Sequence, residues 1–285
     1  MSIARPAKTM DIPTLLAISV ITWASVDILH EIVGHAGAAL LMGYPVKAVS
    51  TTTAYVDIDW KRVIASQGMS AIRLFLAGGT LMNVLSGGLA LLALWRWKTA
   101  GSAARCFLWL FANFSMVIIF MNLVANPLLG FGDFNDFTYQ LEPRGLFKAI
   151  LVGAGLVLCV LGYVWALKLW LPRLKEQRRL QLGFTVLPVL VLIVVQTLSL
   201  IGSPFSRLPP ESNHMLASVF AYLHFVLWVV VVNLIPVPRS IGPVEDIRLP
   251  RADTWLAAGL VVFVLFVFVL GPGIGSFAGH PSLKN

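Results

Sequence analysis

Charged side chains are scarce in this sequence of 285 residues: Asp, Glu, Lys and Arg make up only 12% of it, whereas 58% of the residues are hydrophobic. The mean hydropathy of +0.84 excludes an ordinary soluble domain of this length. Apolar stretches of about 20 residues, the length needed to cross a bilayer, recur along the chain. The sequence therefore predicts an all-α polytopic membrane protein.

Cysteine and acidic residues are also few. Cys106 and Cys159 lie in or beside apolar runs and form no CxxC pair, so they offer no metal site and indicate no redox compartment.

The net charge of +8 does not indicate a nucleic-acid partner, because Lys and Arg cluster in short segments between apolar runs. Loops that face the cytoplasm and anionic lipid have this pattern. We therefore expect contact with the lipid bilayer and none with nucleic acid.

Seven apolar runs predict about seven transmembrane helices, at 12–42, 72–95, 106–128, 147–167, 182–202, 215–235 and 254–275. The first run is too long for a signal-peptide core and should remain as a span. Connecting segments on one side carry 13 Lys and Arg residues and those on the other carry 6. The positive-inside rule then predicts a multi-pass protein of the cell (inner) membrane with a cytoplasmic N-terminus.

One short stretch of the first run holds four titratable side chains within nine residues: Asp27, His30, Glu31 and His35. Each ionisable group at membrane depth costs roughly 2.5 kcal/mol or more unless it is paired, binds a metal or lines a cavity. We therefore predict that this cluster is the functional site.

The spacing of the two histidines leaves two geometries open. His30 and His35 are five residues apart, so a regular α-helix holds them about 140° from each other. A π-bulge, for which Gly34 is a suitable place, would return both imidazoles to one face. Alternatively, a regular helix aligns Asp27, Glu31 and His35 at i, i+4 and i+8. We favour the bulge, because two imidazoles and one carboxylate suit Zn²⁺ better than one imidazole and two carboxylates.

Three further segments carry signals. Val46–Trp60 is rich in Val, Thr and Tyr and predicts a short β-hairpin after the first span. Its edge could pair with an unfolded substrate, or it could be an ordered surface hairpin with no ligand. Asn83 is a carboxamide in mid-bilayer that needs a partner, either a backbone group or a reacting carbonyl. Pro127 and the glycines after it should end the third helix, which places Asp133 and Asp136 on a turn at the membrane surface.

The motif HEIVGHAGAALLMG resembles the first motif of the site-2 protease family of intramembrane zinc metalloproteases. That motif reads HExGH or HExxH in a transmembrane helix followed by small residues, and this chain has one residue more, as HExxxH. AGGTLMN is similar to the family's AGPxxN element, with Gly79 where proline is usual. In the family a strand-rich segment also follows the first motif. The resemblance covers roughly residues 12–140.

The resemblance implies that an aspartate is the third metal ligand, and two stretches compete for this role. Asn233–Pro238 matches the family's NxxPxP pattern, but the Asp-Gly that follows this pattern in the family is missing. The next acidic residues are Glu245 and Asp246. The end of the third span matches loosely but offers Asp133 and Asp136. Since spans one and three run in the same direction, the end of span three lies on the side of His35. We therefore expect Asp133 first and Asp136 second.

The resemblance also implies a fold and a mechanism. Residues 1–140 would form a catalytic core of three transmembrane helices and a β segment, and residues 141–285 an additional four-helix region. His30, His35 and the aspartate would hold Zn²⁺, which lowers the pKa of a water molecule. Glu31 would act as general base and acid, and Asn83 would stabilise the oxyanion. The substrate would be the peptide bond of a transmembrane protein, cleaved by a zinc metalloendopeptidase.

Other interpretations of the cluster stay open. His, Glu and Asp could satisfy one another in a buried network without metal. A non-catalytic protease-like membrane interaction or carrier protein would also explain the extra residue in the motif. Di-iron lipid enzymes need about eight histidines and this chain has five. A ceramidase-like site needs a paired histidine motif that His214 and His224, ten residues apart, do not provide.

Overall fold

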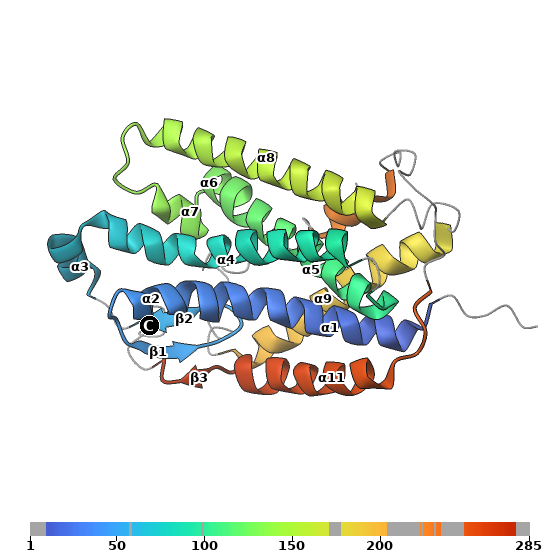
Figure 1. The fold of residues 1–285 in the computed structure, drawn as a ribbon. Coiled ribbons are helices and arrows are strands. Elements are labelled where there is room, and N and C mark those ends of the chain that lie inside the picture. The colour runs from blue at the N-terminus through green and yellow to red at the C-terminus, as the bar shows by residue number, and fades with distance from the viewer. Residues whose placement is uncertain are drawn as a thin grey trace, which may run out of the picture.

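The computed structural model describes residues 10–56, 59–97, 100–170, 178–203, 223, 225–230, 232–234 and 248–277. Long helices lie side by side, and a small sheet lies at one end of the bundle (Figure 1). Six helices of the described chain are long and apolar enough to cross a membrane, at Ile12–Leu41, Met69–Arg96, Ser102–Leu129, Arg144–Leu169, Leu180–Gly202 and Asp253–Leu270. The protein is therefore a helical, multi-pass membrane protein, as predicted.

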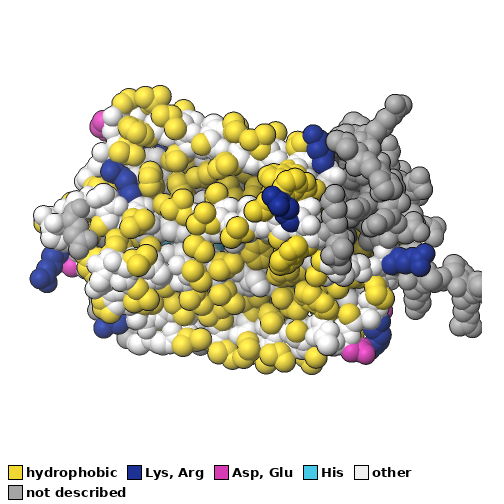
Figure 2. Space-filling model, in the orientation of Figure 1, with side chains coloured by type: hydrophobic (Ala, Val, Ile, Leu, Met, Phe, Trp, Pro, Cys, Tyr) yellow, Lys and Arg dark blue, Asp and Glu magenta, His cyan; other side chains and the backbone are white. Residues whose placement is uncertain are grey.

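The surface of the bundle suits a lipid environment. Hydrophobic side chains cover the middle of the face in Figure 2, and most charged side chains lie toward its two ends. Large apolar residues stand out from three different spans, with 65% of Leu89, 64% of Leu161 and 65% of Phe268 exposed. Exposure on this scale is unfavourable in water but ordinary in hydrocarbon.

The first span contains an interruption at the predicted cluster. Helix α1 (Ile12–Ile28) begins at Asp11, whose Oδ2 accepts a hydrogen bond of 3.1 Å from Thr14 N. It continues without a break into the π-helix η1 (Leu29–Ala36) and then the short helix α2 (Gly37–Leu41). The predicted departure from regular helix is therefore confirmed, and it is longer than a single bulge.

The second and third spans pack against the first. Helix α3 (Trp60–Gln67) precedes the long α4 (Met69–Arg96). The third span consists of α5 (Ser102–Phe120), the π-helix η2 (Met121–Ala125) and α6 (Asn126–Leu129).

The third span does not stop at Pro127: the π-helix η2 passes directly into α6, which contains this proline. The helix ends instead at Gly130, which has the left-handed conformation with φ of 81°. The predicted turn that carries Asp133 and Asp136 was wrong: both residues lie on a short helix, α7 (Gly132–Phe137).

The remaining spans are α8 (Arg144–Trp170), α9 (Arg178–Gly202) and α11 (Asp253–Val264), which continues as the π-helix η5 (Leu265–Leu270). Of the predicted run 215–235, residues 215–222 lie outside the described residues, and a shorter apolar helix occupies Phe225–Leu234. The count of seven spans and the division at residue 140 stay predictions.

The hairpin after the first span is confirmed. Strand β1 (Val46–Val49) pairs antiparallel with β2 (Ala54–Val56) on one side and with β3 (Ile274–Gly275) on the other. Its predicted extension to Trp60 was wrong, because the Asp59 side chain accepts hydrogen bonds from the next backbone amides and begins α3. The sequence did not predict β3, which closes the second edge of β1 to any substrate.

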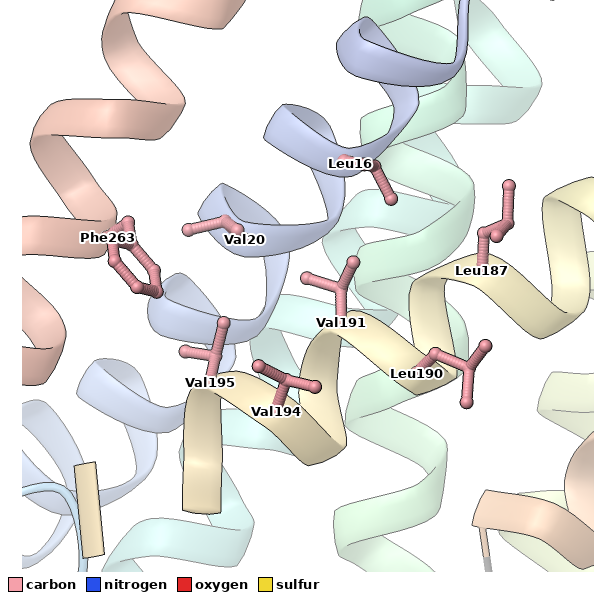
Figure 3. Close-up of a pocket in the computed structure, with 8 residues that line it drawn as sticks. All are labelled: Leu16, Val20, Leu187, Leu190, Val191, Val194, Val195 and Phe263. Atoms are coloured by element: carbon pink, nitrogen blue, oxygen red, sulfur yellow. The ribbon is translucent and has the colours of Figure 1, made fainter. Parts of the chain in front are cut away.

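A groove between α1, α9 and α11 opens on the side of the bundle (Figure 3). Its lining is entirely apolar and consists of Leu16, Val20, Leu187, Leu190, Val191, Val194, Val195 and Phe263. No side chain that lines this groove can donate a hydrogen bond, accept one or ligate a metal ion.

Glycines allow the first two spans to approach closely at η1. A Cβ atom on Gly34 would lie 2.6 Å from Gly79 N and 2.7 Å from Gly78 O, too close for any real side chain. Small residues have this role between many membrane helices. The contact brings the α4 backbone directly beside the two histidines.

We expect Gly34→Ala to destabilise the protein by about 1–3 kcal/mol, because the added methyl group must push α4 away from η1. The matched control is Gly88→Ala. Gly88 is exposed on α4 and has nothing within 4 Å of the Cβ atom that the substitution would add. The control should have a thermal unfolding midpoint at least as high as that of wild type, because alanine favours the helical conformation more than glycine does. Thermal unfolding in detergent, followed by circular dichroism, measures both, and equal midpoints would contradict the predicted close contact.

Candidate metal centre

The π-helix turns His30 and His35 toward each other. Their Nε2 atoms are 3.3 Å apart, and the ring centroids are separated by 4.9 Å at an interplanar angle of 80°. A π-helix bonds residue i to residue i+5, so residues five apart lie on one face. Both side chains are buried, with 8% and 5% of their surface exposed. The interpretation of the five-residue spacing as a π-helical pair is confirmed.

Gly79 forms the floor beneath the two rings. A Cβ atom there would lie 2.6 Å from His35 Nε2 and 2.7 Å from His30 Nε2. Any larger residue would therefore occupy the space in which the imidazoles meet. Gly79 of AGGTLMN therefore leaves room for the two imidazoles, in addition to any role in helix packing.

Asp133 reaches the same point from α7. Its Oδ2 lies 3.2 Å from His35 Nε2 and 3.9 Å from His30 Nε2. Among the described residues, His30, His35 and Asp133 form the one group of three such side chains whose potential ligand atoms all lie within 4.8 Å of one another. The end of the third span is thus on the side of His35, as the topology predicted.

Hydrogen bonds behind the rings fix the orientation of both imidazoles. His35 Nδ1 lies 2.8 Å from the carbonyl oxygen of Phe75. His30 Nδ1 lies 2.6 Å from Asn83 Oδ1, and Asn83 Nδ2 donates to Val26 O at 3.3 Å, which fixes the orientation of the carboxamide. Since both acceptors are carbonyl oxygens, each Nδ1 carries a hydrogen and donates it.

In this hydrogen-bond pattern the Nε2 atoms, which face each other, carry no hydrogen as long as the imidazoles are neutral. With Nδ1 protonated, the Nε2 atom of each neutral imidazole presents a lone pair to the other and to Asp133 Oδ2. Three acceptors separated by 3.2, 3.3 and 3.9 Å repel one another unless a cation lies between them. That cation is either an additional proton or a metal ion.

The spacing of the three atoms suits a tetrahedral metal ion. With metal–ligand bonds of about 2.0–2.1 Å, neighbouring ligands of tetrahedral zinc are about 3.3–3.4 Å apart. Two of the three distances lie within about 0.2 Å of that range and the third is longer. Outer hydrogen bonds from Nδ1 to a carbonyl oxygen are also usual for histidines that ligate metal.

The charge of Asp133 suits a ligand. When the cation between the three atoms is a proton on the rings, burial raises the pKa of this carboxyl group, but the charge of His35, the hydrogen bond from His35 and the charge of His30 lower it by more, so that the pKa lies below its ordinary value. The carboxylate is therefore the form present at neutral pH, and only that form binds a metal ion well.

Glu31 and Asp27 lie beside this group but are not members of it. Glu31 is partly exposed, and its side chain interacts electrostatically with His35 and Asp133 but forms no hydrogen bond with the described chain. Asp27 is 8% exposed, and its Oδ2 has no hydrogen-bond partner there. The alternative stripe of Asp27, Glu31 and His35 is thus not the arrangement found, because the π-helix breaks its i, i+4 register.

The other predicted site residues lie elsewhere. Asp136 is exposed, accepts a hydrogen bond of 3.1 Å from Asn135 Nδ2, and does not join the histidines. Asn83 lies behind His30, with Oδ1 engaged by that ring, and does not face an open position. Glu245, Asp246, His214 and His224 lie outside the described residues.

Sequence reasoning missed the Phe75 carbonyl and the groups that hold α7. A backbone oxygen has no sequence signal. The cations that contact α7 are Arg73, Arg144 and Lys148. The sequence could have indicated two of them, because Arg73 and Lys148 are charged residues within or beside apolar runs.

Comparison with known proteins adds no relative: no family model, curated protein or solved structure matches this chain.

We expect Asp133→Asn to lower zinc affinity by at least about 100-fold, because the amide replaces the only anionic atom among the three that converge. Asp136→Asn, three residues away on the same helix, should bind zinc as wild type does. Competition with a chromophoric chelator measures both affinities. Equal losses in the two variants, or a loss in Asp136→Asn alone, would contradict the assignment.

Proposed function

We propose that this chain is an intramembrane zinc metalloprotease, which hydrolyses peptide bonds of membrane-spanning substrates. One observation carries the proposal: three acceptor atoms, from His30, His35 and Asp133, converge at distances close to those of tetrahedral zinc ligands. Catalytic zinc sites use three protein ligands and leave a fourth position for water or substrate. The resemblance of HEIVGH to the site-2 protease motif supports the same interpretation.

The roles of the residues follow from their positions. His30, His35 and Asp133 would hold the metal ion, which when bound lowers the pKa of a water molecule and polarises a carbonyl group. Glu31 takes the proton from the attacking water and passes it to the leaving amine. Its lack of hydrogen bonds in the described chain and its partial exposure support this role.

Asn83 is assigned a different role from the oxyanion stabiliser that the resemblance implies. Its Oδ1 accepts from His30 and its Nδ2 donates to Val26 O, so it orients a ligand. Outer partners of this kind tune metal affinity through the ligand that they hold.

The substrate class follows from the depth of the site. The candidate ligands lie on a membrane span and at the end of another, so the peptide bond belongs to a segment in or near the bilayer. A helical substrate must unwind there, because its carbonyl groups are already hydrogen-bonded.

Seven spans and a cytoplasmic N-terminus complete the proposal. Asp11 N donates to Leu249 O at 2.8 Å, so α1 and α11 begin at the same end of the bundle. An odd number of spans between α1 and α11 makes this possible, and Phe225–Leu234 supplies the additional crossing. With the positive-inside orientation in the cell membrane, the site lies nearer the extracytoplasmic face.

Glu31→Gln tests the proposed function most sharply. The variant should bind zinc with wild-type affinity and lose peptide cleavage by about 10²–10⁴-fold, because the amide cannot accept the proton. The probe is a panel of fluorescent single-span peptides reconstituted with the protein in lipid vesicles, with fragments identified by mass spectrometry. Glu142→Gln, on an exposed loop position, is the matched control and should cleave as wild type does.

The outcomes separate two classes of protein. Cleavage by Glu31→Gln at the wild-type rate would contradict the assigned role. A wild-type protein that binds zinc but produces no fragments from the panel would favour a protease-like membrane interaction or carrier protein.

A further inference from the structure

Helix α7 carries Asp133 but is too short to hold its own position. It has six residues, and isolated helices below about 12 residues are marginal even in favourable sequences. Gly130, which ends the third span, and Gly132, the first residue of α7, both have positive φ angles, so the chain bends between the two helices. The buried Phe134, stacked on Phe137 at 5.3 Å, is its apolar anchor. Such a segment needs further contacts to present a carboxylate at a fixed point.

Two arginines supply such contacts to backbone carbonyl groups at the far end of α7. Arg73 of α4 donates to Phe137 O at 3.3 Å and to Tyr139 O at 3.2 Å. Arg144 of α8 donates to Asn135 O at 3.0 Å. Carbonyl groups at the C-terminal end of a helix have no partner within it and carry its partial negative charge. Cations are therefore favourable there.

Lys148 of α8 joins the two sides of the glycine-containing link. Its Nζ donates to Pro127 O at 3.0 Å, before the link, and to Asn135 Oδ1 at 2.9 Å, after it. One cation thus fixes the distance between the end of the third span and the helix that carries Asp133. Asn135 is the common acceptor, because its side-chain oxygen also accepts from Arg144 at 3.2 Å.

We propose that Arg73, Arg144 and Lys148 form a cationic clamp on α7 that positions Asp133 as the third metal ligand. The proposal rests on the metal centre of the proposed function and adds to it a role for α8, which lies outside the part of the chain that resembles the proteases. The three cations are positioning residues, since they reach Asp133 only through the backbone and Asn135.

The clamp predicts a loss of metal affinity without loss of a ligand. Lys148→Met keeps the length of the side chain and removes its charge, and Arg144→Gln removes a second contact. Each variant should bind Zn²⁺ about tenfold more weakly than wild type, at the lower end of the effect of groups that orient ligands. Lys148→Arg should restore most of the affinity. Lys61→Met, on an exposed position of α3, is the control and should bind as wild type does.

Two readouts distinguish positioning from general stability. Zn²⁺ affinity is measured by chelator competition, and the visible spectrum of the Co²⁺ form reports the ligand geometry. We expect Lys148→Met to change both, while thermal unfolding of the metal-free protein changes little. Asn135→Ala, which removes the acceptor and leaves every cation in place, should reproduce the effect and serves if Lys148→Met does not fold.

The result also separates this inference from the one on which it rests. Wild-type protein that binds neither Zn²⁺ nor Co²⁺ would overturn the metal centre itself. Wild-type binding, with Lys148→Met, Arg144→Gln and Asn135→Ala all within twofold of wild type, would overturn the clamp alone. A lower unfolding temperature with unchanged affinity and Co²⁺ spectrum would likewise reduce the three cations to a structural role.

Discussion

The mutual repulsion of three acceptor atoms is the interaction on which the account depends. His30 Nε2, His35 Nε2 and Asp133 Oδ2 face one another inside a membrane protein, and in neutral imidazoles the outer hydrogen bonds use the only ring hydrogens. In a low-dielectric environment such an arrangement is unstable without a cation. A divalent ion at the centre would convert the same geometry from repulsive to attractive. The neighbouring side chain of Glu31 would then lie beside a Lewis acid.

Several local structures bring these three atoms together. The π-helix places residues five apart on one face, and the contact of Gly34 with Gly78 and Gly79 brings α4 close enough to hold the rings from behind. A conventional α-helix or a larger residue at position 79 would separate the two imidazoles. The third atom comes from a different segment, so its position depends on the packing of α7 against its neighbours. Helix irregularities of the π type occur mostly at functional sites, and this one carries both histidines of the candidate metal centre.

Part of this could be predicted from the sequence. Ionisable residues in an apolar run indicated the two histidines of the group that the structure brings together, and the five-residue spacing of His30 and His35 required a π-helix for a shared face. The direction of the spans selected the end of the third one, where Asp133 lies. These inferences succeed because they depend on local periodicity and on the alternation of spans, which one sequence contains. The short hairpin after the first span was predicted for the same reason, from β-branched residues between glycines.

The rest depends on contacts between distant segments. The pairing of β3 with β1 joins residues more than 200 positions apart, and no local pattern indicates it. The partner of Asn83 could not be chosen from the sequence, since a backbone group and a substrate carbonyl were equally suitable. The hydrogen bonds of Lys148 to Pro127 and Asn135 required the relative positions of two helices and a loop.

The metal content of the purified protein tests the central claim most directly. The protein is prepared without a polyhistidine tag, freed of loosely bound metal and analysed by mass spectrometry of the elements, beside a His35→Ala variant. We expect about one zinc ion per wild-type chain and almost none in the variant, because removal of one imidazole leaves two ligands. Equal zinc in both proteins, or none in the wild type after incubation with zinc, would contradict it.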